Sequence, residues 1–147
     1  MLKITVLAVG KLKEAFWKDA CAEYLKRLEG YAKVQVREIP DSTPGKEAQG
    51  LLVQLPEQTP VLLLDIKGKE VASETIAHKL EAYALDGTSH VVFIIGGSDG
   101  VAPEVKARAT EHISFGPITL PHNLARVVLL EQLYRAFKIM RNEPYHK

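Results

Sequence analysis

Cysteine is almost absent from this sequence, and long apolar runs are missing. The single cysteine, Cys21, allows no intrachain disulfide, which fits a reducing compartment. No apolar run approaches the length needed to cross a bilayer. The run Ile4–Gly10 ends like a signal-peptide cleavage site, but one Lys precedes it and Lys11 and Lys13 follow directly. A first β-strand explains the run better, so we expect a cytoplasmic protein with no membrane partner.

Motifs for metal binding and hydrolysis are also lacking. No His or Cys pair has ligand spacing, and we expect no metal. No G-x-S-x-G nucleophile motif, G-x-G-x-x-G fingerprint or Walker lysine occurs. Metalloenzyme, hydrolase and dinucleotide-binding interpretations therefore have little support. The five histidines are scattered along the chain: His78, His90, His112, His122 and His146.

Excess charge of either sign is small, since the formal net charge is +1. This value alone makes no case for a nucleic-acid partner. The charge is nevertheless unevenly placed, with a surplus of four positive charges in residues 1–37 and three in 122–147, and a deficit of six in 38–121. A fold that brings the two ends together would carry a basic face, although chance scatter over a solvated surface explains the pattern as well.

The composition that remains is that of an ordinary globular protein. The 147 residues are 46% hydrophobic and 25% charged, which excludes collagen-like and disordered classes. This length suits one domain over residues 1–147. Apolar periodicity predicts alternating strands and helices. The expected strands are Leu2–Val9, Val34–Ile39, Val61–Asp65 and Val91–Ile95; the expected helices are 13–29, a short one through Leu51–Leu55, Ser73–Leu85 with Ser73 as its cap, Glu104–Ala109 and Asn123–Asn142.

The apolar segments also indicate how these elements are covered. Val91–Ile95 has no polar side chain, which is typical of a strand buried on both faces of a parallel sheet. The predicted class is α/β with a mostly parallel sheet. We expect a turn at Lys67-Gly68-Lys69 after the third strand, and mixed extended pieces over Ile113–Leu120. The last helix is apolar on every side at Val127–Leu130, which makes it a candidate subunit interface.

Three predicted strand ends are unusual, and ligands of parallel α/β folds bind at such ends. They are Leu64-Asp65, the glycine-rich segment Gly96–Gly100, and Phe115–Leu120, which leads into the last helix. Glycines allow a backbone to approach a ligand closely, although a tight turn between strand and helix needs them equally.

His122 and Arg126 stand four residues apart at the start of the last helix, where they could share a face. Histidine handles protons near neutral pH, and arginine binds phosphate. Helix capping and a surface arginine are the structural alternatives. The C-terminal segment mixes aromatic and basic side chains, as proteins that bind looped RNA do; these are Tyr134, Arg135, Lys138, Arg141, Tyr145, His146 and Lys147.

Seven segments in order carry a family resemblance: Ile4–Gly10, Leu64-Asp65-Ile66 with Gly68-Lys69, Leu85-Asp86-Gly87, Ile95-Gly96-Gly97 with Gly100, Thr119-Leu120-Pro121-His122 with Leu124 and Arg126, Glu131–Ala136, and Asn142 with Pro144-Tyr145-His146. Together they resemble the RlmH (YbeA-like) family of SPOUT methyltransferases. The resemblance implies a C-terminal trefoil knot, S-adenosylmethionine as methyl donor, and a homodimer. It also implies methyl transfer to N3 of a pseudouridine in 23S rRNA of the large ribosomal subunit, on the assembled ribosome.

The resemblance also implies site residues. The implied cofactor-binding residues are Leu64, Gly96, Gly97, Phe115, Gly116, Pro117, Ile118, Thr119 and Leu120. The expected catalytic residues are His122 and His146 as candidates to take the N3 proton, Arg126 to hold a phosphate or the anionic ring, and Tyr145 to stack on the base. If one subunit's tail covers its partner's cofactor site, the catalytic site is composite. The alternative function is a non-catalytic RNA-binding or ribosome-assembly factor with the same fold.

Overall fold

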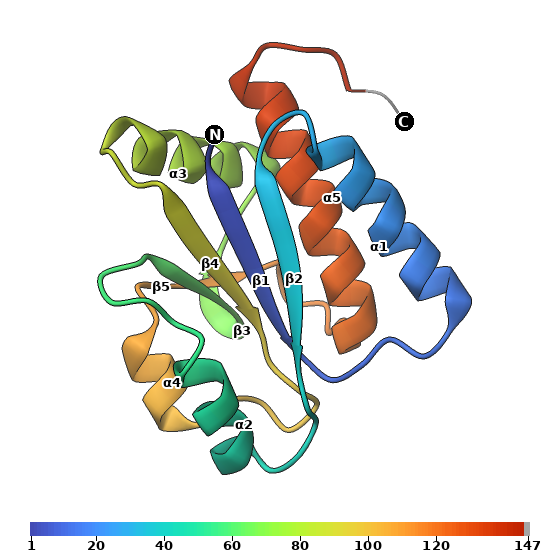
Figure 1. The fold of residues 1–147 in the computed structure, drawn as a ribbon, viewed down its shortest axis with the longest axis vertical. Coiled ribbons are helices and arrows are strands. Elements are labelled where there is room, and N and C mark those ends of the chain that lie inside the picture. Colours follow the sequence, from blue (N-terminus) through green and yellow to red (C-terminus); the bar gives the residue numbers. More distant parts are fainter. Residues whose placement is uncertain (146–147) are drawn as a thin grey trace.

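Five parallel strands form one sheet in the order β2-β1-β4-β3-β5, with helices on both faces (Figure 1). The computed structural model describes residues 1–145. Its strands are β1 (Lys3–Val9), β2 (Lys33–Ile39), β3 (Val61–Glu70), β4 (His90–Ile95) and β5 (Glu111–Ser114); its helices are α1 (Ala15–Leu28), α2 (Pro44–Leu52), α3 (Ser73–Leu85), α4 (Pro103–Arg108) and α5 (His122–Met140). The predicted α/β class with a parallel sheet is confirmed.

Side chains of the central strands alternate between two hydrophobic cores. In β4, Val91, Phe93 and Ile95 point into a core shared with α1, α3 and α5. Val92 and Ile94 point into a second core shared with α2 and α4. A strand buried on both faces has to be apolar throughout, which explains the continuous apolar run.

The sheet has a topological switch point at its centre. β1 runs into α1 on the first face, whereas its neighbour β4 runs into α4 on the second face (Figure 1). Connections that leave neighbouring strands toward opposite faces open a crevice at the carboxyl edge of the sheet, where ligands of open α/β folds bind.

The third strand differs from its prediction. The expected turn at Lys67-Gly68-Lys69 is wrong, because β3 continues to Glu70. Its pairing with β5 shifts register between Leu64 and Lys69, so the strand bulges and then pairs again. A Cβ on Gly68 would lie 2.7 Å from the carbonyl carbon of His112, so only glycine fits this approach.

Two helix predictions also need correction. α2 begins at Pro44 and ends at Leu52, so it lies mostly before the expected segment Leu51–Leu55. Thr43 caps it by accepting a hydrogen bond from the Lys46 amide at 3.3 Å. Ser73 does not cap α3, since Ala72 holds that position and the Ser73 hydroxyl donates to Gln132 Oε1 instead.

The two basic ends of the sequence lie side by side. α1 packs against α5 along the first face of the sheet, at the right of Figure 1. The Tyr31 hydroxyl donates to Glu143 at 2.9 Å, which joins the β2 side of the molecule to the C-terminal segment. The two basic ends of the sequence are therefore neighbours in the fold, although Arg37 of β2 points to the second face, where it donates to Gln54 Oε1 at 2.7 Å. Among the helices of residues 1–145, none is long and apolar enough to cross a membrane.

Candidate functional site

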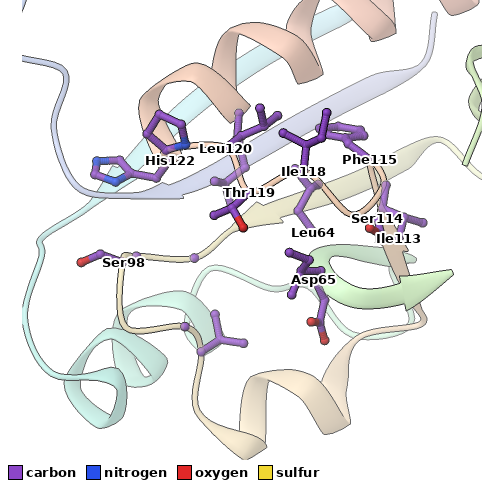
Figure 2. A pocket seen from close by; sticks show the side chains of 18 of the residues that line it. Leu64, Asp65, Ser98, Ile113, Ser114, Phe115, Ile118, Thr119, Leu120 and His122 are labelled. Carbon is purple, nitrogen blue, oxygen red and sulfur yellow. The ribbon is translucent and has the colours of Figure 1, made fainter. Parts of the chain in front are cut away.

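A cavity of about 590 Å³ lies at the carboxyl ends of β3, β4 and β5 (Figure 2). The three unusual strand ends meet there. Of the positions expected to hold a cofactor, all except Pro117 line the cavity: Leu64, Gly96, Gly97, Phe115, Gly116, Ile118, Thr119 and Leu120. The volume and the mixed apolar and backbone lining are typical of a small-molecule site.

The segment from β5 to α5 forms one wall of this cavity. Gly116 has φ +109°, and its amide donates to Ser114 Oγ at 3.1 Å, which fixes the turn. Within residues 1–145, no hydrogen bond engages the amides of Ile118, Thr119 or Leu120, so they are available to a ligand. The apolar side chain of Ile118 is 74% exposed at this wall. Both features suit a loop that contacts a bound molecule.

The glycine-rich turn after β4 forms a second wall. The Gly100 amide donates to the Gly97 carbonyl at 3.0 Å, and Gly100 has φ +81°. A Cβ on Gly97 would lie 3.1 Å from Val9 and 3.3 Å from the buried carboxylate of Glu47. Glu47 in turn accepts a hydrogen bond from the Ser42 amide at 2.8 Å. The glycine at position 97 therefore lets the turn pack onto β1 and α2.

β3 supplies a carboxylate at the cavity, at the point after Leu64 where its pairing with β5 shifts register. The Lys67 amide donates to Asp65 Oδ1 at 3.0 Å, and His112 Nδ1 lies 3.3 Å from Asp65 Oδ2. Burial raises the pKa of Asp65, but the Lys67 amide, His112 and Lys106 outweigh it, so the pKa lies below its ordinary value. Asp65 is ionised at neutral pH, so its carboxylate can accept a hydrogen bond at the cavity.

Two charged lining residues, Asp65 and Lys106, received no role from the sequence. Asp65 is the last residue of the predicted strand Val61–Asp65, so its position was a usable signal. Lys106 lies in α4, and its approach to β3 depends on how the helix packs. The sequence around Lys106 does not indicate that contact with β3.

His122 connects the first cavity with another. It is the first residue of α5, after Pro121, and lines the first cavity together with Leu120 (Figure 2). It also lines a second cavity of about 530 Å³ at the ends of β1 and β2. A Cβ on Gly10, which has φ +96°, would lie 3.5 Å from His122 Nε2. Neither His122 nor Asn123 caps the helix.

Arg126 is buried behind this position, with 3% of its side chain exposed. Its Nη1 donates to Glu38 Oε2 at 2.7 Å and its Nη2 donates to the Gly10 carbonyl at 3.2 Å. Burial raises the pKa of Glu38. Hydrogen bonds from Arg126 and the Leu12 amide lower it by more, so the net pKa lies below its ordinary value. Arg126 is therefore neither a surface arginine nor part of a cavity lining; in this chain its guanidinium joins β1, β2 and α5.

Tyr145 packs against α5 of the same chain, away from both cavities. Its hydroxyl donates to Glu131 Oε2 at 2.7 Å, and the Arg135 guanidinium carbon lies 4.0 Å from its ring centroid. Burial and the Glu131 carboxylate raise the pKa of this phenol. His146, the other expected catalytic residue of the tail, lies outside the described residues. Stacking of Tyr145 on a substrate base stays a prediction.

No group of three or more His, Cys, Asp or Glu side chains in residues 1–145 is placed to hold a metal ion. The geometry is thus a largely apolar cavity with free backbone amides, one carboxylate and a histidine shared with a second, charged cavity. The sequence profile of a family described as "Predicted SPOUT methyltransferase" matches residues 2–146. The chain belongs to the SPOUT methyltransferase family. Methyl transfer is the activity that this membership supports.

A solved structure agrees with the SPOUT fold. It is described as "a probable methylase family protein from Haemophilus influenzae Rd KW20", and it matches with a TM-score of 0.60 at 14% sequence identity. The match covers 95% of the present chain and 66% of that protein, so this SPOUT chain spans slightly less than two thirds of the neighbour's length. At this identity the likeness shows a shared fold.

Proposed function

We propose that this protein transfers a methyl group from S-adenosylmethionine to N3 of a pseudouridine in 23S rRNA, acting as a homodimer on the assembled ribosome. Membership in the SPOUT family supports methyl transfer. The finer assignment rests on the RlmH-like segments of the sequence, and it includes the trefoil knot and a cytoplasmic location. The observation that carries the proposal is the meeting of the three strand ends in one cavity.

The cavity residues fit S-adenosylmethionine. Free amides at Ile118, Thr119 and Leu120 suit the hydrogen-bonding edge of an adenine ring, and the Asp65 carboxylate suits a hydroxyl or ammonium group. Gly96 and Gly97 place backbone, without side chains, along the wall. The bound cofactor supplies an electrophilic methyl group on a sulfonium. The chain's own residues have to hold an acceptor in line with it.

The acceptor nitrogen carries a proton at neutral pH, and its loss requires a base. His122 borders both cavities, so its imidazole can accept that proton directly or through an ordered water. Tyr145 lines neither cavity of its own chain and donates to Glu131, so its proposed contact with the base has to be made in a partner subunit.

A methyl-transfer assay tests the proposal with labelled cofactor and three substrates that carry the pseudouridine without its methyl group: 70S ribosomes, isolated large subunits and naked rRNA. We expect transfer to ribosomes and loss of the label when the target uridine is replaced. Transfer to naked rRNA alone would contradict the assembled substrate. Calorimetry with S-adenosylmethionine separates the remaining alternative, because an RNA-binding or assembly factor without catalysis would show no binding at millimolar cofactor.

A further inference from the structure

The second cavity has no assigned role, although it adjoins the first. Its lining comes from the segment after β1, the end of β2 and the start of α5. These residues are Gly10, Lys11, Lys13, Glu14, Glu38, Ile39, Pro40, Asp41, His122 and Asn123. Within residues 1–145, only His122 lines both cavities. A molecule in the second cavity can therefore meet a molecule in the first at this side chain.

We propose that the acceptor nucleotide enters this second cavity, and that Lys11, Lys13 and Phe16 hold the RNA strand at its rim. The inference rests on the proposed methyl transfer to RNA and adds the surface that binds the acceptor. The volume of about 530 Å³ is large enough for one nucleotide extruded from its strand.

The chemistry of the lining suits a nucleotide better than an apolar ligand. Lys11 and Lys13 are exposed and donate to phosphate oxygens, while Glu14 and Asp41 are exposed and accept from the N–H groups of a uracil-type base. Glu38 is already held by Arg126 and the Leu12 amide. Its charge is compensated before any ligand arrives.

An aromatic platform continues from the rim of the cavity. Phe16, in the first turn of α1, is 63% exposed, and its ring centroid lies 4.9 Å from that of Trp17. Exposed Lys13 and Lys18 flank the pair. Exposed rings between lysines are what single-stranded RNA binds, because bases stack on the rings and phosphates meet the cations.

The floor of this cavity is rigid. Arg126 links Glu38 on β2 with the Gly10 carbonyl after β1, and the Leu12 amide donates to Glu38 at 3.3 Å. Arg126 thereby acts as a positioning residue, because it fixes the segment against which His122 packs. The direct contact of Arg126 with a phosphate or the anionic ring stays a prediction, since its guanidinium lines neither cavity in residues 1–145.

The test compares Lys11→Ala/Lys13→Ala and Phe16→Ala with Lys3→Ala/Lys33→Ala. The control removes the same charge at the opposite, amino edge of β1 and β2. Unmodified 70S ribosomes are the probe, and their binding is measured by sedimentation independently of methyl transfer. We expect KM for ribosomes to rise roughly tenfold for each cavity variant, with kcat and the calorimetric affinity for S-adenosylmethionine nearly unchanged. The control should resemble the unmodified protein.

Unchanged ribosome binding and KM in both cavity variants would overturn the proposal. Dissociation of a dimer in those variants, measured by light scattering, would also overturn it, since a second copy would then cover the surface. If the unmodified protein binds ribosomes but transfers no methyl group, the proposed function fails, and the sedimentation comparison still decides the RNA surface.

Discussion

The buried guanidinium of Arg126 is paired with one carboxylate, that of Glu38. Glu38→Gln keeps the shape but leaves the guanidinium without its counter-charge. We expect the free energy of unfolding to fall by about 1–2 kcal/mol, at the low end for a buried pair because the Glu38 side chain is 41% exposed. Urea denaturation measures this. Glu23→Gln, which breaks the exposed pair with Arg27, is the control and should change the free energy of unfolding much less, because solvent screens that pair. Equal losses in the two variants would contradict the interpretation.

Glu111 predicts how stability responds to acid. Burial raises the pKa of the Glu111 carboxyl. Hydrogen bonds from Lys79 and Tyr83 lower it by more, so the net pKa lies below the ordinary 4.5. The folded state therefore binds this proton less readily than the unfolded state, so the stabilisation is complete above pH 4.5 and is lost as the pH falls through the folded pKa. In Glu111→Gln, the urea midpoint should change less between pH 7 and pH 3.5 than in the unmodified protein. Parallel pH profiles would show that Glu111 does not contribute.

At the scale of elements, Gly68 controls how β3 lies against β5. A methyl group there would meet the His112 backbone at 2.7 Å and push away the strand that leads into the cavity wall at Phe115–Leu120. Gly68→Ala should cost about 1–3 kcal/mol of stability and weaken S-adenosylmethionine binding measured by calorimetry. Gly45→Ala is the control. Gly45 lies in the first turn of α2, and a Cβ added there would have no neighbouring atom within 4 Å, so this change should be neutral or slightly stabilising. Undiminished cofactor binding in Gly68→Ala would count against this coupling.

Elements with a continuous apolar pattern were predictable, since burial on both faces leaves β4 no polar position. The segments that form the first cavity were also predictable, because parallel strands bring their carboxyl ends to one edge of the sheet. The end of β3 was not predictable, because Lys67-Gly68-Lys69 has the composition of a turn, and only pairing with distant β5 makes it a strand. Arg126 shows the same limit, since its partner Glu38 is remote in sequence and no helical spacing reveals their contact.

At the scale of the whole molecule, a net charge of +1 limits how RNA can be bound. The two basic ends are neighbours in the fold, because α1 packs against α5. The acidic middle segment supplies most of the cavity that holds the cofactor in our proposal. With about three phosphate contacts, affinity for naked rRNA should fall less than 100-fold between 50 and 200 mM salt, whereas six to ten contacts would cost about 10³-fold or more. Filter binding at several salt concentrations measures this slope. Tight, salt-sensitive binding to arbitrary RNA would contradict a target recognised by its assembled shape.

The composite site makes the last prediction, because Tyr145 lies on α5 and not at the cavities of its own chain. His122→Ala should remove the proposed base, and deletion of residues 144–147 should remove the tail, so each homodimer should bind S-adenosylmethionine yet transfer no methyl group. A mixed dimer of the two variants still joins one intact cavity to one intact tail if the tail acts across the interface. Equal mixing makes about half of the dimers mixed, each with one working site, so about a quarter of the unmodified activity should return. The two variants are mixed while unfolded and refolded together, and methyl transfer to 70S ribosomes is then measured. Full activity of the deletion variant would exclude any role for the tail, and no recovery on mixing would place the tail on its own subunit's cavity.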